Sequence, residues 1–333
     1  MQWADPPCRG NPDMAYPDQP FPFTGGTSAF LENYYALIDA VKSWTPSPGI
    51  VIWGFLRDSH GGVEAARRLA DYAAERGVSL IPGVGTSGYG GIYYEGEHPF
   101  SARTMMERYP ELVVANRKVD ELGAVERGAT LNPLDPRVIE WLTEGIDWLL
   151  ETFSIGGVNL ELGDFFVAQD EHSIARRAEI DGVENEFFQM LALHYGELIS
   201  GLIAKHPGRE ISYATYSDFP EEQLRRNAAF SHRIPAEAVC QWTLTRSQES
   251  TDRRDLLPKR NRGFAHLFSI ANRTDQCDLS ERVARLCEIA SRSGFEGVGI
   301  YGEIGWHHNE YARRNYEAFQ RYTATPGEAV SFC

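Results

Sequence analysis

The order of its apolar segments constrains this chain more than any other feature of the sequence. Short apolar runs, each of strand length, alternate with longer segments whose apolar residues recur at helical spacing. The pattern predicts seven strands: 49–55, 78–83, 157–162, 211–216, 238–244, 264–270 and 297–302. Regular alternation of strand and helix is typical of a parallel sheet that is covered by helices.

The segments between the strands carry signals for the start and end of helices. The predicted helices are 29–43, 62–76, 102–109, 136–153, 185–205, 221–228, 280–293 and 309–322. The helix at 136–153 is the clearest, because Asp135 suits the N-cap position and Pro136 suits the first turn. Gly77 would end the helix that precedes the strand at 78–83.

We therefore predict an α/β fold, a single (β/α)8 TIM-type barrel formed by residues 27–325. A Pro-rich, irregular N-terminal arm (1–26) precedes it, a short tail (326–333) follows it, and the arm would supply the eighth strand near 21–23. The 333 residues, 42% of them hydrophobic, suit one barrel of ordinary size. A long loop follows the third strand, at about 84–132, and loops of this length are usually functional.

Composition narrows the classes of partner and compartment. The net charge of -15 disfavours nucleic acid and anionic lipid as partners. Five cysteines without a CxxC pair argue against a disulfide framework or a structural zinc site. We see no apolar run of about 18 residues that would span a membrane, and no signal peptide at the start. The protein is expected to be cytoplasmic, or secreted with its leader absent from this sequence, and its oligomeric state stays open.

Catalytic groups of barrel enzymes lie at the C-terminal ends of the strands, so the candidate residues are those at the strand ends. Alternation along 157–162 puts Asn159 and Glu161 on one face, opposite Val158 and Leu160. Glu161 would then point into the barrel among apolar residues, and burial raises a carboxyl pKa toward the range of a general acid. The alternative is that Glu161 pairs with an arginine of a neighbouring strand.

A second carboxylate is needed for most acid–base chemistry on a neutral substrate. Glu303 follows the last strand, where it shares a face with Tyr301 and has glycines around it. Asp218, after the strand at 211–216, is a rival candidate. Both have ordinary structural alternatives, a charge near a helix N-terminus for Glu303 and an N-cap for Asp218.

Other polar and aromatic residues near the strand ends suit substrate binding. Sugars offer hydroxyl groups and flat apolar faces, which polar side chains and aromatic rings recognise. The candidates are Trp53, Arg57, Asp58, His60, Tyr94, Asn159, Asp164, Tyr216, Trp242, Tyr301, Trp306 and His307. Each aromatic residue among them is, taken alone, more often a core residue, and His60 has the alternative of a helix cap.

Two carboxylates across one end of a barrel form the arrangement that glycoside hydrolysis requires. One protonates the leaving oxygen, while the other attacks the sugar or activates water. The loop near 89–100 would restrict the cleft to a terminal sugar and so favours exo action. No cofactor is expected for this chemistry.

Three segments, 77–101, 108–112 and 132–166, resemble bacterial glycoside-hydrolase-like barrels related to hexosaminidases and α-glucuronidases. In those families an Arg-Gly-(Val/Ile)-x-(Val/Ile)-Ile-Pro segment in strand 3 precedes a strand 4 whose end carries the acid. Residues 76–82 and Glu161 occupy these places here. The resemblance covers about 50–170 and implies a barrel fold and a carbohydrate substrate. The chain departs from hexosaminidases, which carry an adjacent Asp-Glu pair, because two residues separate Glu161 from Asp164.

Two other functions fit the same residue types. The first is a metal-dependent barrel isomerase or hydrolase, which would use Glu161, Asp164, His60, His266 and His307, although no HxH or HExxH spacing occurs. The second is a barrel that binds carbohydrate without turning it over. A chelator separates the first from a glycoside hydrolase, and turnover separates the second.

Overall fold

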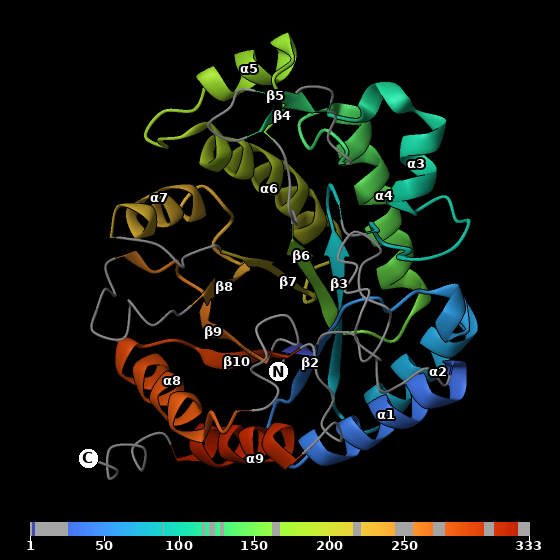
Figure 1. Cartoon of the computed structure of the whole chain (residues 1–333), viewed down its shortest axis with the longest axis vertical. Helices are drawn as coiled ribbons and strands as arrows, with labels where there is room; N and C mark the ends of the chain where they lie inside the picture. Colours follow the sequence, from blue (N-terminus) through green and yellow to red (C-terminus); the bar gives the residue numbers. More distant parts are fainter. Residues whose placement is uncertain are drawn as a thin grey trace.

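A parallel sheet that curls into a closed barrel forms the centre of the molecule (Figure 1). The computed structural model describes residues 2–3, 26–88, 90–114, 117–119, 124–126, 130–161, 167–215, 221–243, 256–268, 277–302 and 310–325. Around the barrel the strands follow one another in chain order, and neighbours pair in parallel. They are β1 (Gln2–Trp3), β2 (Gly49–Ile52), β3 (Ser79–Gly85), β6 (Gly157–Glu161), β7 (Glu210–Ala214), β8 (Val239–Thr243), β9 (Asn261–Phe268) and β10 (Gly297–Gly302).

The predicted α/β fold with a parallel, curled sheet is confirmed, and the seven predicted strands correspond to β2, β3 and β6 to β10. The two residues of β1 pair with β2 on one side and β10 on the other. The predicted position of an arm strand, 21–23, lies outside the described residues, as do most of the arm and the tail.

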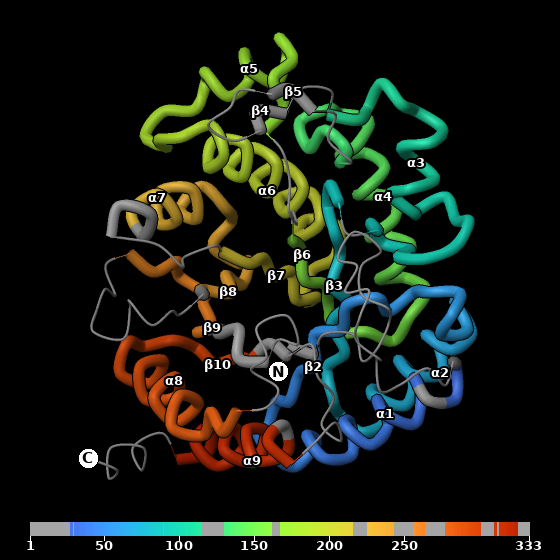
Figure 2. Tube along the Cα trace, viewed as in Figure 1, coloured from blue at the N-terminus to red at the C-terminus, as the bar shows by residue number. Residues whose placement is uncertain are grey.

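Helices surround the sheet on its outer side (Figure 1). The colour of the tube runs from blue to red around this ring, so the helices, like the strands, follow chain order (Figure 2). The ring contains α1 (Gly26–Val41), α2 (Gly62–Glu75), α4 (Pro136–Thr152), α6 (Glu186–Lys205), α7 (Glu221–Ser231), α8 (Ser280–Ser293) and α9 (Glu310–Ala324).

Short elements decorate this ring. The predicted helix near 102–109 is present as α3 (Ala102–Arg108), followed by the 3-10 turn η2 (Pro110–Leu112). Among the elements that were not predicted are the antiparallel hairpin of β4 (Arg117–Val119) and β5 (Ala124–Glu126), and the helix α5 (Glu171–Ala178). The strands of the hairpin have three residues each, too few to show a period of two.

Alternation along β6 separates the outer core from the barrel interior. Val158 and Leu160 are fully buried in the hydrophobic core. The hydroxyl of Tyr195 on α6 donates to the carbonyl of Leu160 at 3.4 Å, which places this face against the helix. Asn159 is equally buried but points the other way, toward polar residues of β7 and β8.

One helix of the described chain, α6, is long and apolar enough to cross a membrane by length and composition alone. Half of its most apolar window is buried inside the protein, and it packs against α4, α5 and α7. Its apolar character is therefore accounted for by its place in the ring of helices.

Candidate active site at the C-terminal ends of the strands

Three buried polar residues form a network inside the barrel, which we call the polar floor: Asn159 on β6, Ser212 on β7 and Gln241 on β8. The side-chain oxygen of Asn159 accepts hydrogen bonds from Ser212 Oγ at 3.0 Å and from Gln241 Nε2 at 2.7 Å. Burial of polar groups is costly unless they are hydrogen-bonded, so this network holds the three side chains in one arrangement.

Glu161 is the last residue of β6 and is half-buried. Because side chains alternate along a strand, it lies on the same face as Asn159, two residues nearer the C-terminal end of the barrel. Its backbone is fixed by β3, since Glu161 pairs with Gly85 and its carbonyl accepts the N–H of Thr86 at 2.8 Å. The predicted general acid is therefore carried on a rigid strand end rather than on a loop.

Trp53 and Tyr94 form an aromatic wall beside β2 and β3. The buried ring of Trp53 occupies space left by Gly83, where a Cβ would lie 2.5 Å from the ring. Tyr94 meets Trp53 edge-on, with ring centroids 6.2 Å apart. The guanidinium of Arg57 lies 4.9 Å from the centroid of the Tyr94 ring, within the range of a cation–π contact.

The segment after β2 is bound to the loop after β3 through Glu95. Ser59 Oγ donates to Glu95 Oε2 at 2.7 Å, and Arg57 Nη1 lies 3.7 Å from the same oxygen. The backbone N–H of Asp58 donates to the carbonyl of Glu95 at 3.1 Å. Arg57 is buried, so its charge is directed at Glu95 and the Tyr94 ring. These contacts give the wall a fixed position.

Asp58 has an internal partner. Tyr93 donates its hydroxyl proton to Asp58 Oδ1 at 2.5 Å, and burial together with this carboxylate raises the pKa of Tyr93. Gly96 makes room for the carboxylate, because a Cβ there would lie 2.2 Å from Asp58 Oδ2 and the backbone has φ +119°. This arrangement favours a structural role for Asp58, in place of the predicted substrate contact.

His60 and Trp242 also lie in packed surroundings. His60 stacks on Phe30 with ring centroids 4.3 Å apart, and burial, helped by the positive charge of Arg57, lowers its pKa to about 4. Trp242 is buried in the hydrophobic core together with Cys240, its neighbour but one along β8. Both placements favour packing over substrate binding.

Several predicted site residues lie outside the described part of the chain. They are Asp164, Tyr216, Asp218, Glu303, Trp306 and His307. Tyr301 is described in its backbone, where it pairs with His266 of β9. The described candidates that the structure brings to the C-terminal ends of β2, β3 and β6 are Trp53, Arg57, Tyr94, Asn159 and Glu161.

Sequence reasoning did not select Ser212 or Gln241 as site residues, whereas it placed Glu95 on a possible cleft wall. A signal for Gln241 was present, since it is a carboxamide between the apolar residues Cys240 and Trp242 of a buried strand. The contact of Glu95 with Ser59, 36 residues earlier in the chain, had no signal in the sequence. Within the described residues, no group of three or more His, Cys, Asp or Glu side chains is arranged to hold a metal ion.

Comparison with known proteins supports the barrel fold. No protein-family model and no curated protein sequence matches the chain. Among solved structures, the fold is similar to that of an O-GlcNAc hydrolase from Thermobaculum terrenum (TM-score 0.58, 9% identity), with 90% of this chain and 57% of that chain covered. It is also similar to the catalytic domain of the β-amylase from Paenibacillus polymyxa (TM-score 0.57, 11% identity), with 93% and 97% covered.

A third similar structure is the α-amylase from Geobacillus thermoleovorans, with a TM-score of 0.56, 11% identity, and 98% and 78% of the two chains covered. The chain thus shares its barrel fold with these three structures. At identities of 9–11% the likeness concerns the fold, and one fold hosts many activities.

Proposed function

We propose that this protein is a glycoside hydrolase that cleaves O-glycosyl bonds, with Glu161 as the general acid. The observation that carries the proposal is the position of Glu161, half-buried at the end of β6, on the face of the polar floor. Its neighbour strand β3 leads into the aromatic wall of Trp53 and Tyr94. A carboxyl group and a stacking surface at the same end of a barrel suit a sugar substrate.

The proposed reaction needs a second carboxylate, and Glu303 is our candidate for it. Glu161 would protonate the glycosidic oxygen as the bond breaks, while Glu303 attacks the anomeric carbon or removes a proton from the attacking water. A carboxylate separation of about 5–5.5 Å corresponds to retention of configuration, and about 6.5–9.5 Å to inversion. Asp218 is the alternative for the second role.

We further propose a complete (β/α)8 barrel, with β1 as its first strand, and exo action on a terminal sugar. The exo proposal rests on the loop after β3, which Glu95 binds to the segment after β2 and which therefore forms a fixed side of the site. An exo enzyme releases one small sugar at a time from an oligosaccharide. Rapid shortening of a polymer by internal cleavage would contradict this mode.

The test is a screen of aryl glycosides and oligosaccharides with the wild type, Glu161→Gln and Glu303→Gln. We expect both substitutions to lower kcat/KM by at least ~10²-fold, because each removes a proton-transfer or nucleophilic group without changing side-chain volume. Glu75→Gln is the matched control, since Glu75 ends α2 and its side chain is 73% exposed. This variant should keep wild-type activity.

Two other outcomes would favour a different function. Activity that a chelator abolishes would contradict the proposal and favour a metal-dependent isomerase or hydrolase. Saturable sugar binding without turnover of any substrate would favour a non-catalytic carbohydrate-binding barrel. Loss of activity in Asp218→Asn but not in Glu303→Gln would assign the second role to Asp218 and leave Glu161 in its role.

A further inference from the structure

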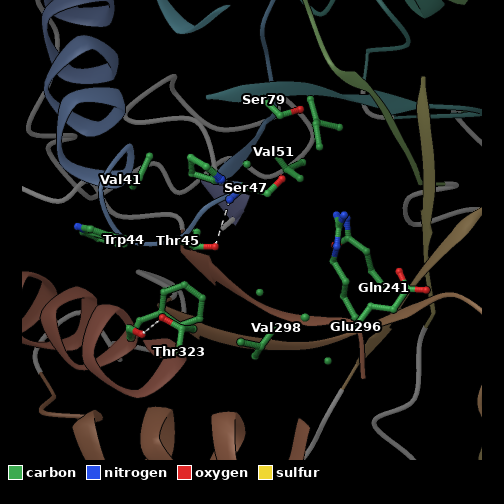
Figure 3. Close-up of a pocket in the computed structure, with 18 of the residues that line it drawn as sticks. Val41, Trp44, Thr45, Ser47, Val51, Ser79, Gln241, Glu296, Val298 and Thr323 are labelled. Carbon is green, nitrogen blue, oxygen red and sulfur yellow. Dashed lines mark hydrogen bonds between the residues drawn. The ribbon is translucent and has the colours of Figure 1, made fainter. Parts of the chain in front are cut away.

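A cavity of about 460 Å³ opens at the end of the barrel opposite the candidate active site (Figure 3). We call it the lower cavity. Four of the strands that line it contribute their first residues, Gly49, Ser79, Glu210 and Gly297, and β8 contributes its third, Gln241. Since all strands run in parallel, this is the N-terminal end, whereas Glu161 ends β6 at the other. Its volume is within the range of small-molecule sites.

Two glycines line this cavity, although the backbone conformation at neither position requires a glycine. Neither Gly49 nor Gly297 has a left-handed conformation, and a Cβ at either position would meet its nearest neighbours only at ordinary contact distances of 3.7 Å or more. Elsewhere in the barrel the opposite holds, because a Cβ at Gly157 would lie 1.9 Å from a backbone oxygen. Barrel interiors are normally filled by layers of side chains, so a cavity lined by Gly49 and Gly297 is a departure from the rule.

The lining of the lower cavity is divided into two kinds of surface. Trp44, which is half-buried, lies with Thr45 and Thr323 on one side of the opening in Figure 3, and Gln241 lies on the opposite side. Phe319 and Val298 add further apolar surface. A ligand here would therefore meet an indole ring and, across the cavity, a carboxamide.

The charges of the lining disfavour an anion. Arg262 forms two parallel hydrogen bonds with Glu210, at 2.6 and 2.5 Å, so its guanidinium is already matched by a carboxylate. Glu296, the other lining carboxylate, pairs with Arg260 at 3.2 Å. Two carboxylates and one guanidinium give the described charged residues of the lining a net charge of -1. A neutral ligand with hydroxyl groups can use these planar side chains without adding charge.

We propose that the lower cavity is a second binding site, for a small neutral polyhydroxylated molecule such as a monosaccharide. Trp44 would stack on the apolar face of its ring, and Gln241, Ser79 and the Glu210–Arg262 pair would bind its hydroxyl groups. The cavity opens at the end of the barrel opposite the proposed catalytic end, although Gln241 also belongs to the polar floor, and the proposal does not depend on the protein being a hydrolase.

Binding of D-glucose, D-galactose and D-mannose, measured by calorimetry and ligand-observed NMR, tests this proposal. Gly297→Val places two methyl groups in the cavity, and we expect it to weaken binding of the sugar that binds best by at least tenfold. Gly201→Val is the matched control, because Gly201 lies exposed on α6 with no atom within 4 Å of its Cβ position. It should leave the affinity unchanged.

Further variants distinguish the lower cavity from the catalytic end. Trp44→Ala should weaken the same binding, whereas a loss of binding in Trp53→Ala alone would place the sugar at the aromatic wall. D-glucuronate, the anionic counterpart of glucose, should bind more weakly than the neutral sugars. The proposal is wrong if no neutral sugar binds, if Gly297→Val binds as the wild type does, or if only Trp53→Ala lowers the affinity. Gly49→Val replaces Gly297→Val if that variant does not fold.

Discussion

Gly83 and Gly297 both lie on barrel strands, but the structure uses them in opposite ways. Gly83 is packed against the ring of Trp53, so an added methyl group would force the ring to move. A Cβ at Gly297 would meet only the Arg262 side chain, at ordinary contact distances of 3.7–3.9 Å. We expect Gly83→Ala to lower the free energy of unfolding by about 1–3 kcal/mol through overpacking. Gly297→Ala should raise it by about 0.4–1 kcal/mol, because alanine restricts the unfolded chain.

Urea unfolding of the two variants and the wild type measures this difference directly. The two substitutions make the same chemical change on two strands of one barrel, so each serves as the control for the other. Destabilisation of similar size in both would show that Gly297 is as tightly packed as Gly83, and it would also remove the argument for an open lower cavity.

Side-chain alternation was the part of the site that could be predicted residue by residue. It placed Asn159 and Glu161 opposite Val158 and Leu160, in agreement with the contacts of β6. The same rule places Trp242 with Cys240 on the outer face, whereas the position of Trp242 near a strand end had suggested a substrate contact. The surroundings of Asp58 and His60 could not be predicted, because Tyr93 and Phe30 are distant in sequence.

At the scale of elements, α4 shows how a local signal becomes a stabilising contact. Asp135 accepts the backbone N–H of Arg137 at 2.9 Å and so satisfies one donor of the first turn, while Pro136 needs no partner for its nitrogen. We expect Asp135→Ala to lower the free energy of unfolding by about 1 kcal/mol. Glu140→Ala, at an exposed position of the same helix, is the control and should change it by less than about 0.5 kcal/mol.

Thermal and urea unfolding provide the measurement. The free energy of unfolding should fall with urea concentration at the same rate in all three proteins. An equal effect of both substitutions would mean that helix propensity, and not the cap, accounts for the loss. The pKa of Asp135 is lowered by its bonds to Arg137 even though burial acts in the opposite direction. The contribution of the cap should therefore fade as the carboxylate becomes protonated in acid.

Long elements with a repeated pattern were predictable, and short ones were not. The ring helices and seven strands span several turns or pleats each, so their apolar residues recur often enough to reveal a period. The hairpin of β4 and β5 has three residues per strand, and α5 has eight residues of mainly polar character. Their formation depends on neighbours such as Asn132, whose amide donates to Asp170, the N-cap of α5, at 3.0 Å.

At the scale of the whole molecule, two buried histidines make stability depend on pH. Burial lowers the pKa of His60 and of His194 from 6.5 to about 4. The unfolded chain therefore binds protons at a higher pH than the folded one, so the free energy of unfolding falls as the pH is lowered from about 7 to 4. The loss approaches roughly 3 kcal/mol for each histidine at the lower end of this range.

The comparison of His194→Gln with the wild type tests this sign. The variant keeps a neutral polar side chain near the carbonyl of Pro133, which now bonds to His194 Nδ1 at 2.9 Å. Its free energy of unfolding should fall less steeply between pH 7 and 4, and the difference in slope should correspond to about one proton per molecule. His232→Gln, at an exposed position, should keep the wild-type slope. Equal slopes for all three proteins would contradict the assignment.

The general architecture followed from the order of elements, whereas the internal arrangement of the barrel did not. The alternation of strands and helices specified a parallel sheet with helices outside. The lower cavity depends on which inward positions carry glycine. Its walls come from α1, α9 and six different strands. No local pattern contains that information, because it arises only when the strands meet.

The polar floor determines what a pH–rate profile of this protein would report. Asn159, Ser212 and Gln241 carry two carboxamides and a hydroxyl, none of which gains or loses a proton in the range where enzymes work. The electrostatic field that they impose on Glu161 is therefore the same in acid and in base. The polar floor therefore contributes no inflection of its own to the pH–rate profile, and any inflection arises from other groups.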